Sequence, residues 1–263
     1  MVICMLKDLY QINPIFLSCI GGVITFLFTA FGSAIVFFIK KTNKRFMNGL
    51  LSISAGIMLS ASFFSLINPS IEICYKLKQN FFLTVIAGFI IGSFFVFFGN
   101  KIFDKINTDD KFNLKRCILL FTSITLHNIP EGLAVGVAFG NIHYGGSLIS
   151  ALSLTIGIAI QNFPEGSAIS LPLRREGFSR SKSFLIGVLS GLVEPISAIL
   201  GSLLVLKINH ILSFILAFAA GAMIFVTILE LIPESQSDEK KDLMALLLII
   251  GFSTMMILDV LLG

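Results

Sequence analysis

Charged residues are scarce in this sequence of 263 residues: Asp, Glu, Lys and Arg make up only 13% of it. A soluble domain averages about 25%. Apolar residues make up 56%, and the mean hydropathy is +0.95. A chain with so little polar surface cannot cover a folded core in water, so the composition excludes a soluble protein and predicts an integral membrane protein.

Several other features are missing. The four cysteines are scattered without a C-x-x-C pair, which favours buried apolar cysteines over a disulfide framework. No cleavable signal peptide is expected, because no basic segment precedes the first apolar run and that run is too long. The net charge of +4 does not indicate a nucleic-acid partner, because the basic residues gather in loops between apolar runs.

Long apolar runs dominate the chain, and each approaches or exceeds the roughly 20 residues that cross a bilayer. They predict an all-α protein with eight transmembrane helices in a single membrane domain over residues 1–263. The predicted helices span residues 14–39, 47–68, 81–99, 117–140, 148–173, 184–206, 211–233 and 243–262.

The distribution of Lys and Arg predicts the orientation. Fifteen of the 19 basic residues follow the first, third, fifth and seventh predicted helices. Cytoplasmic loops carry the excess of positive charge, so these loops, including the polar segment 101–116, are expected in the cytoplasm. Both termini are then extracytoplasmic, and we expect the protein in the cytoplasmic (plasma) membrane.

Two copies of one motif lie 34 residues apart, deep in the fourth and fifth apolar runs: His-Asn-Ile-Pro-Glu-Gly at 127–132 and Gln-Asn-Phe-Pro-Glu-Gly at 161–166. In each copy the first residue and the glutamate are separated by four positions and share one helix face. The proline removes a backbone N–H and interrupts the helix. Ionisable side chains at such depth are costly, which indicates a functional site.

A second repeat relates Ala-Gly-Ile-Met at 55–58 to Ala-Gly-Ala-Met at 220–223, an offset of 165 residues. The predicted topology gives these two helices opposite directions, as it does for the two motif helices. Inverted repeats around interrupted helices are typical of transporters with a binding site at mid-membrane. We therefore expect a 3+2+3 arrangement of helices.

The buried carboxylates predict a metal site. Glu131, Glu165 and Glu194 would repel one another in an apolar environment, and divalent cations would remove that cost. His127 and Gln161 share faces with two of these glutamates, and Asn128 and Asn162 offer carbonyl oxygens. Such mixed ligands suit Zn²⁺, Fe²⁺ or Mn²⁺. The alternative for the asparagines is a pair of kinked helices joined by buried hydrogen bonds.

Four other residues each have both a functional and a structural interpretation. Met58 offers a soft thioether as a further metal ligand, although methionine more often packs in a core. Acidic residues near the ends of the spans fit a transport path: Glu72 and Asp259 toward the outer mouth, and Glu230 toward the cytoplasmic exit. Each of the three is equally compatible with a place at the membrane interface.

At these motifs the sequence resembles the ZIP (Zrt-/Irt-like) family of divalent-metal transporters, particularly its bacterial GufA-type branch. The resemblance depends on HNIPEGLAVG at 127–136, QNFPEG at 161–166 and VEP at 193–195. It implies a binuclear centre, transport of Zn²⁺ and related ions toward the cytoplasm, and often a homodimer. One implied site comprises His127, Glu131, Gln161, Glu165 and, more loosely, Met58; the other comprises Asn128, Glu131, Asn162, Glu165 and Glu194.

This chain departs from the family pattern at two ligands. Many members have His where this chain has Gln161, and some have Asp where it has Asn162, so metal preference among Zn²⁺, Fe²⁺, Mn²⁺ and Cd²⁺ is expected to differ. The loop at 101–116 lacks the His-rich tract common in the family.

Three functions compete. A carrier would expose the metal alternately to each side as one helix bundle moves against another. A gated divalent-metal channel is the second reading. An intramembrane metal-dependent hydrolase is disfavoured, because no H-E-x-x-H motif occurs. We therefore expect a metal transporter that is not an enzyme, with the metal as transported substrate and no organic cofactor.

Overall fold

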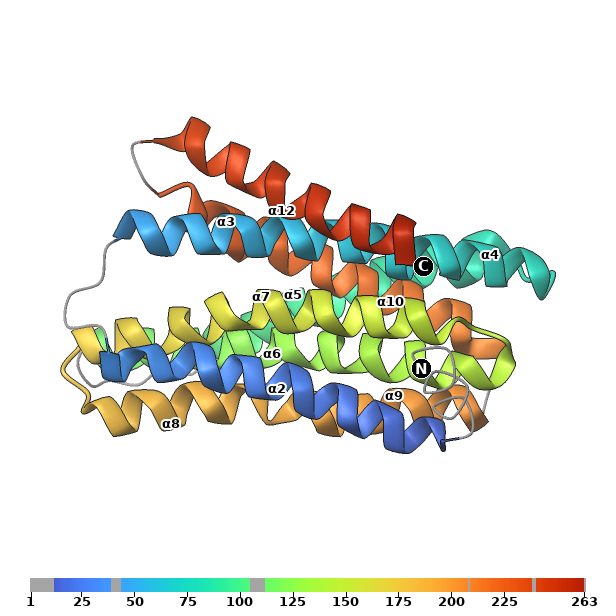
Figure 1. Cartoon of the computed structure of the whole chain (residues 1–263), viewed down its shortest axis with the longest axis horizontal. Coiled ribbons are helices and arrows are strands. Elements are labelled where there is room, and N and C mark those ends of the chain that lie inside the picture. The colour runs from blue at the N-terminus through green and yellow to red at the C-terminus, as the bar shows by residue number, and fades with distance from the viewer. Residues whose placement is uncertain (1–11, 39–43, 105–111, 208, 238–239, 263) are drawn as a thin grey trace, which may run out of the picture.

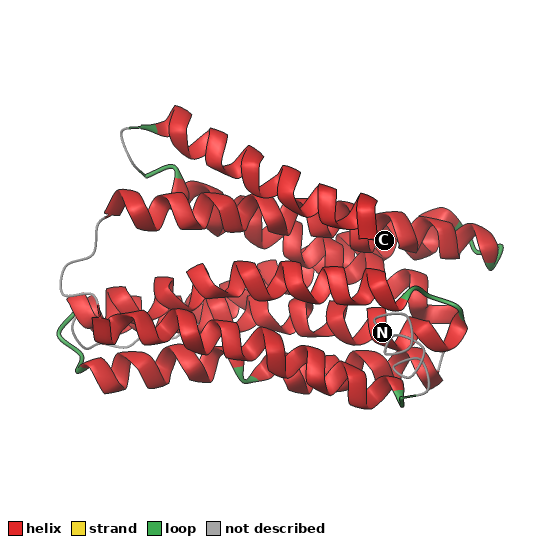
Figure 2. Cartoon of the chain, viewed as in Figure 1, coloured by secondary structure: helices red, strands yellow, loops and turns green. Residues whose placement is uncertain are grey.

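The computed structural model describes residues 12–38, 44–104, 112–207, 209–237 and 240–262. Within these ranges the chain forms helices and short connections, with no strand (Figure 2). The helices are α2 (Pro14–Phe38), α3 (Lys44–Ala61), η1 (Ser62–Ile67), α4 (Asn68–Lys76), η2 (Phe82–Ile86), α5 (Ala87–Asp104), α6 (Phe112–Asn141), η3 (Ile142–Tyr144), α7 (Leu148–Arg175), α8 (Arg180–Gly191), α9 (Val193–Lys207), η4 (Asn209–Ile211), α10 (Leu212–Val226), η5 (Thr227–Leu231), α11 (Ile232–Ser235) and α12 (Lys241–Leu262).

Six helical segments in the described ranges are long and apolar enough to cross a membrane: Pro14–Phe38, Arg45–Lys76, Phe82–Gly99, Arg180–Lys207, Leu212–Ser235 and Lys241–Leu261. Their outward faces carry large exposed apolar side chains, such as Phe94 and Phe98 on α5 and Leu246 and Ile249 on α12. So much exposed apolar surface is compatible with lipid rather than water. The prediction of an all-helical integral membrane protein is confirmed.

The two helices that carry the repeated motif, α6 and α7, are 30 and 28 residues long and are not among those six. Residues 105–111, inside the predicted loop 101–116, lie outside the described residues, as do residues 1–11 before α2. The predicted sixth span, 184–206, consists of α8 and α9 with a break at Leu192. This break comes directly before Val193-Glu194-Pro195, where the proline cannot continue the backbone hydrogen bonding.

The helices form two bundles (Figure 1). In the first bundle, α2 packs against α6, α7, α8 and α9, and α6 packs against α9. In the second bundle, α3 packs against α12, and α10 packs against α4 and α5. Contacts of α3 with α7 and of α10 with α6 join the two bundles.

Glycine determines how closely the second bundle packs. Gly56 of α3 lies against the carbonyl oxygen of Leu248 in α12, and Gly221 of α10 lies against that of Phe89 in α5. A Cβ at either glycine would overlap the facing backbone oxygen. Close approach through glycine strengthens van der Waals packing between membrane helices.

Residues 165 apart form the same local structure in α3 and α10, which run in opposite directions (Figure 1). Ser62 Oγ donates to the carbonyl of Met58 at 2.7 Å, and Thr227 Oγ1 donates to that of Met223 at 2.8 Å. At each of these hydroxyl residues the α-helix changes to a wider π-helical turn, η1 or η5. The Ala-Gly-x-Met repeat therefore marks a structural correspondence.

Candidate metal centre

The described polar side chains of the two motifs are all buried in the middle of α6 and α7, with none more than 3% exposed: Asn128, Glu131, Gln161, Asn162 and Glu165. Glu194 of α9 is also fully buried. The backbone of His127 belongs to α6, but its side chain lies outside the described part of the structure. Two helices of similar sequence thus bring polar groups to one interior region.

The glycine of each motif allows a neighbouring helix to come close. Gly132 of α6 lies against the carbonyl of Glu194 in α9, and Gly166 of α7 lies against that of Thr29 in α2. A Cβ at either position would overlap these backbone atoms. The motif glycines therefore bring α9 and α2 next to the polar residues, and Thr29 and Glu194 occupy corresponding places.

Amide donors link three helices at this centre. Gln161 Nε2 donates to Glu131 Oε1 at 2.8 Å, which joins α7 to α6. Asn162 Nδ2 donates to Glu194 Oε2 at 2.7 Å, which joins α7 to α9. Hydrogen bonds to charged acceptors are short and strong, so these contacts hold the carboxylates in place.

Four buried acceptor oxygens at the centre have no hydrogen-bond partner: Asn128 Oδ1, Glu131 Oε2, Gln161 Oε1 and Asn162 Oδ1. Buried polar atoms are rarely left unpartnered, because the loss of water is costly without a replacement. Each of these atoms accepts and does not donate when the carboxylate is ionised. Unpartnered acceptor oxygens of this kind are candidate ligands for a cation.

The clustering of carboxylates at the centre favours the same kind of ligand. Glu131 lies near enough to Glu165 and Glu194 for the three carboxylates to repel one another. No Lys or Arg is among the buried residues of the described chain. Buried carboxylates are costly unless they are paired or bind a metal, and a divalent ion supplies the opposite charge.

Among the described side chains, no group of three or more His, Cys, Asp and Glu residues is gathered around a point as in a closed metal site. Glu131 and Glu194 each accept a hydrogen bond from a neighbouring amide instead. The oxygens available at this centre are a mixture of carboxylate and carboxamide oxygens.

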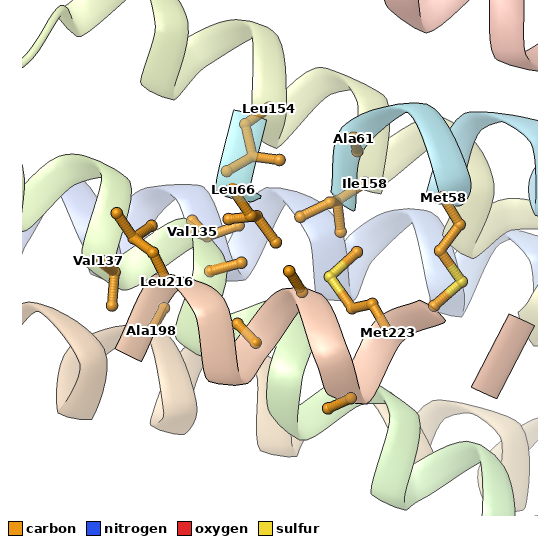
Figure 3. Close-up of a cluster of buried hydrophobic side chains, with 14 of the residues drawn as sticks. Met58, Ala61, Leu66, Val135, Val137, Leu154, Ile158, Ala198, Leu216 and Met223 are labelled. Atoms are coloured by element: carbon orange, nitrogen blue, oxygen red, sulfur yellow. The ribbon is translucent and has the colours of Figure 1, made fainter. Parts of the chain in front are cut away.

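Met58 of α3 is fully buried and lies in a cluster of apolar side chains that includes Leu66, Ile158 and Met223 (Figure 3). One turn earlier, Ser54 Oγ donates to the carbonyl of Gln161 at 2.9 Å. The second bundle therefore contacts α7 at the motif itself. Met58 lies one turn further along α3 from this contact.

Two of the three residues predicted to line a transport path share a cavity. This cavity of about 600 Å³ lies between α4, α12 and the α6–α7 connection, and both Glu72 and Asp259 line it. Ser65 Oγ donates to Asp259 Oδ1 at 2.6 Å. Glu230, in η5, does not line this cavity.

Sequence reasoning missed the hydroxyl and carbonyl partners of the motif residues. Thr29 Oγ1 donates to Glu194 Oε1 at 2.9 Å, and Asn128 Nδ2 donates to the carbonyl of Ser190 at 2.8 Å. A signal was available, because Thr29 precedes Glu194 by the 165 residues that separate the two Ala-Gly-x-Met segments.

The apolar helices and their buried acidic centre define a helical membrane protein. The family model for the ZIP zinc transporter matches residues 104–259, more than half of the chain. Zinc transporter ZIP11 of Xenopus tropicalis is 34% identical over 95% of this chain and 98% of its own length. Zinc transporter ZIPB of Bordetella bronchiseptica is 33% identical, over 94% and 81%. Zinc transporter GufA of Myxococcus xanthus is 37% identical over 56% of each chain.

The chain therefore belongs to the ZIP family, and the family predicted from the two motifs is confirmed. Its relatives are transporters and not enzymes, as predicted.

Proposed function

We propose that this protein transports divalent transition-metal ions, foremost Zn²⁺, across the membrane toward the cytoplasm through a binuclear centre between α6 and α7. The observation that carries the proposal is the set of four buried acceptor oxygens without hydrogen-bond partners at this centre. The names of the relatives, all zinc transporters, favour Zn²⁺ over Fe²⁺, Mn²⁺ and Cd²⁺ as the main substrate.

The two metal positions share Glu131 and Glu165, whose carboxylates would bridge the ions. The first position takes its other ligands from His127, Gln161 and Met58, and the second from Asn128, Asn162 and Glu194. Contacts already present across the helices support this division, because Gln161 meets Glu131 and Asn162 meets Glu194.

The movement we propose is a shift of the first bundle against the second, which exposes the centre alternately to each side of the membrane. The division into two bundles supports this movement, because almost all of the ligands belong to the first one. Glu72 and Asp259 would attract cations into the outer cavity, and Glu230 would line the cytoplasmic exit.

Eight spans in a 3+2+3 inverted repeat, with both termini extracytoplasmic, complete the proposed topology. It is supported by the equivalent contacts of residues 165 apart and by the positions of the outermost described helices, since α2 begins and α12 ends toward the same end of the molecule (Figure 1). In line with the family resemblance, we propose the cytoplasmic membrane as its location and a homodimer as its assembly.

The test is uptake of Zn²⁺ into proteoliposomes. Glu131→Gln and Glu165→Gln keep the shape of each side chain and remove its charge, so we expect folded variants with uptake reduced by roughly 100-fold or more. The matched control is Glu234→Gln, which removes an exposed carboxylate from α11. Normal Zn²⁺ uptake by both of the buried-site variants would refute the proposal.

The same assay distinguishes a carrier from a channel. A carrier must change conformation for every ion, so its flux saturates with Zn²⁺ concentration and its turnover is slow. Flux that rises linearly, far above such turnover, would favour the gated channel.

A further inference from the structure

The carboxylate of Glu194 has a hydrogen-bond donor on each oxygen, unlike that of Glu131 in the same centre. Its Oε1 accepts a hydrogen bond from Thr29 of α2, and its Oε2 accepts one from Asn162 of α7. At Glu131, by contrast, Oε1 has a donor and Oε2 has no partner. The carboxylate of Glu194 is therefore oriented by donors from two other helices.

The hydroxyl of Thr29 has a second acceptor within reach, the carbonyl of Thr25 one turn earlier, at 3.4 Å. A threonine hydroxyl has one proton to donate, and in a helix it commonly goes to the carbonyl four residues earlier. Here the contact with Glu194, at 2.9 Å, is the shorter one. Thr29 thus makes a tertiary contact in place of the usual contact within its own helix.

The repeat with an offset of 165 residues explains why the hydroxyl of Thr29 lies next to Glu194. The backbone of Thr29 lies against Gly166 as that of Glu194 lies against Gly132, and the two residues are 165 apart. The fold therefore brings two corresponding side chains together. One carries the carboxylate, and the other carries a donor that bonds to it.

The space for this contact is kept open by Gly191, at the end of α8. A Cβ there would lie 3.0 Å from the Cβ of Thr29 and 3.1 Å from Glu194 Oε1. Any larger residue would press on the hydrogen-bonded pair.

We propose that Thr29 is a positioning residue for the second metal position, where its hydroxyl holds the Glu194 carboxylate in the orientation that receives the ion. This inference rests on the proposed binuclear centre. Donors behind a metal ligand fix its orientation, and their loss typically lowers metal affinity about 10- to 100-fold. Thr29 makes no contact with the ion itself, so its effect is confined to the position that Glu194 serves.

The experiment is calorimetric titration of the full-length protein in detergent with Zn²⁺, together with the thermal melting point of each variant. Thr29→Val removes the donor and keeps the shape of the side chain. We expect one of the two binding steps to lose affinity roughly tenfold, while the other step and the melting point stay unchanged. Thr29→Ser keeps the donor and should restore the affected step.

Ser33→Ala is the matched control, because Ser33 Oγ reaches from the same helix to the carbonyl of Gly166 at 3.1 Å, without a contact to Glu194. It should leave both steps as in the wild type. If Thr29→Val does not fold, Thr29→Ala gives the same comparison with a smaller side chain.

The possible outcomes separate the two proposals. A wild-type protein that binds no Zn²⁺, or binds it in one step only, contradicts the binuclear centre. Two steps in the wild type, with neither step weakened by Thr29→Val, both weakened alike, or the affected step not restored by Thr29→Ser, overturn the role of Thr29 and leave the transport function standing.

Discussion

The two bundles use related repeats for opposite purposes. In the first bundle, residues 165 apart bring Thr29 and Glu194 together as a polar pair at the buried centre. In the second, residues 165 apart place Met58 and Met223 in an apolar cluster, with each downstream hydroxyl bonded within its own helix. One architecture thus forms a polar centre in one half and a tightly packed apolar support in the other.

This difference predicts that substitutions in the two bundles have different effects on transport and on folding. Polar side chains in the first bundle cost stability unless they are hydrogen-bonded or bind a cation. Glycine contacts in the second bundle contribute packing whether or not metal is present. Variants in the first bundle should therefore impair transport without loss of the fold, and variants in the second should impair the fold first.

The largest effect is expected for Gly221→Ala in the second bundle. The added methyl group meets the carbonyl of Phe89, so α10 and α5 must separate. Overpacking of this kind costs about 1–3 kcal/mol, which should lower the melting point in detergent and the yield of folded protein. Gly49→Ala is the control, because its methyl group meets only the end of the flexible Leu247 side chain, at 3.1 Å. Equal melting points for the two variants would contradict the role given to the Gly221 contact.

A smaller effect is expected from the two matched methionines. Met58→Leu and Met223→Leu change the volume little, and each should cost less than about 1.5 kcal/mol in stability. If the Met58 thioether binds metal, Met58→Leu should weaken inhibition of Zn²⁺ uptake by Cd²⁺ roughly tenfold, because Cd²⁺ is the softer ion. Met223→Leu should leave that inhibition unchanged. The same inhibition in both variants would assign Met58 to packing alone.

The polar residues of the centre and the correspondence between the repeated segments were predictable from local sequence. Buried Asn and Glu in apolar runs are costly enough to stand out. The predicted interruption at the motif prolines was wrong, because α6 and α7 continue as α-helices through Pro130 and Pro164. The Ala-Gly-x-Met repeat predicted which segments correspond. These signals lie in single residues whose chemistry is unusual for their surroundings.

Other features could not be predicted because the residues concerned are ordinary in a membrane helix. Thr29 resembles any threonine that bonds to its own helix, and its contact with Glu194 depends on how α2 lies beside α9. Likewise Gly221 faces a carbonyl only because α10 and α5 approach at that point. Their partners are far away in the sequence. The 165-residue offset relates Thr29 to Glu194, but the contacts themselves are identified only in the packed structure.

The smallest effect is expected where the two motif copies themselves differ, at His127 and Gln161. Gln161 offers an amide oxygen that has no partner, whereas an imidazole offers nitrogen, which suits Zn²⁺ better than Mn²⁺. Gln161→His should therefore raise the preference for Zn²⁺ over Mn²⁺ about threefold in competition uptake assays, a modest change because the carboxylates remain. His127→Gln is the reciprocal variant and should lower that preference. A competition profile that neither substitution alters would show that the ion is not bound by these two positions, and that the difference between the copies serves only the hydrogen bond from Gln161 to Glu131.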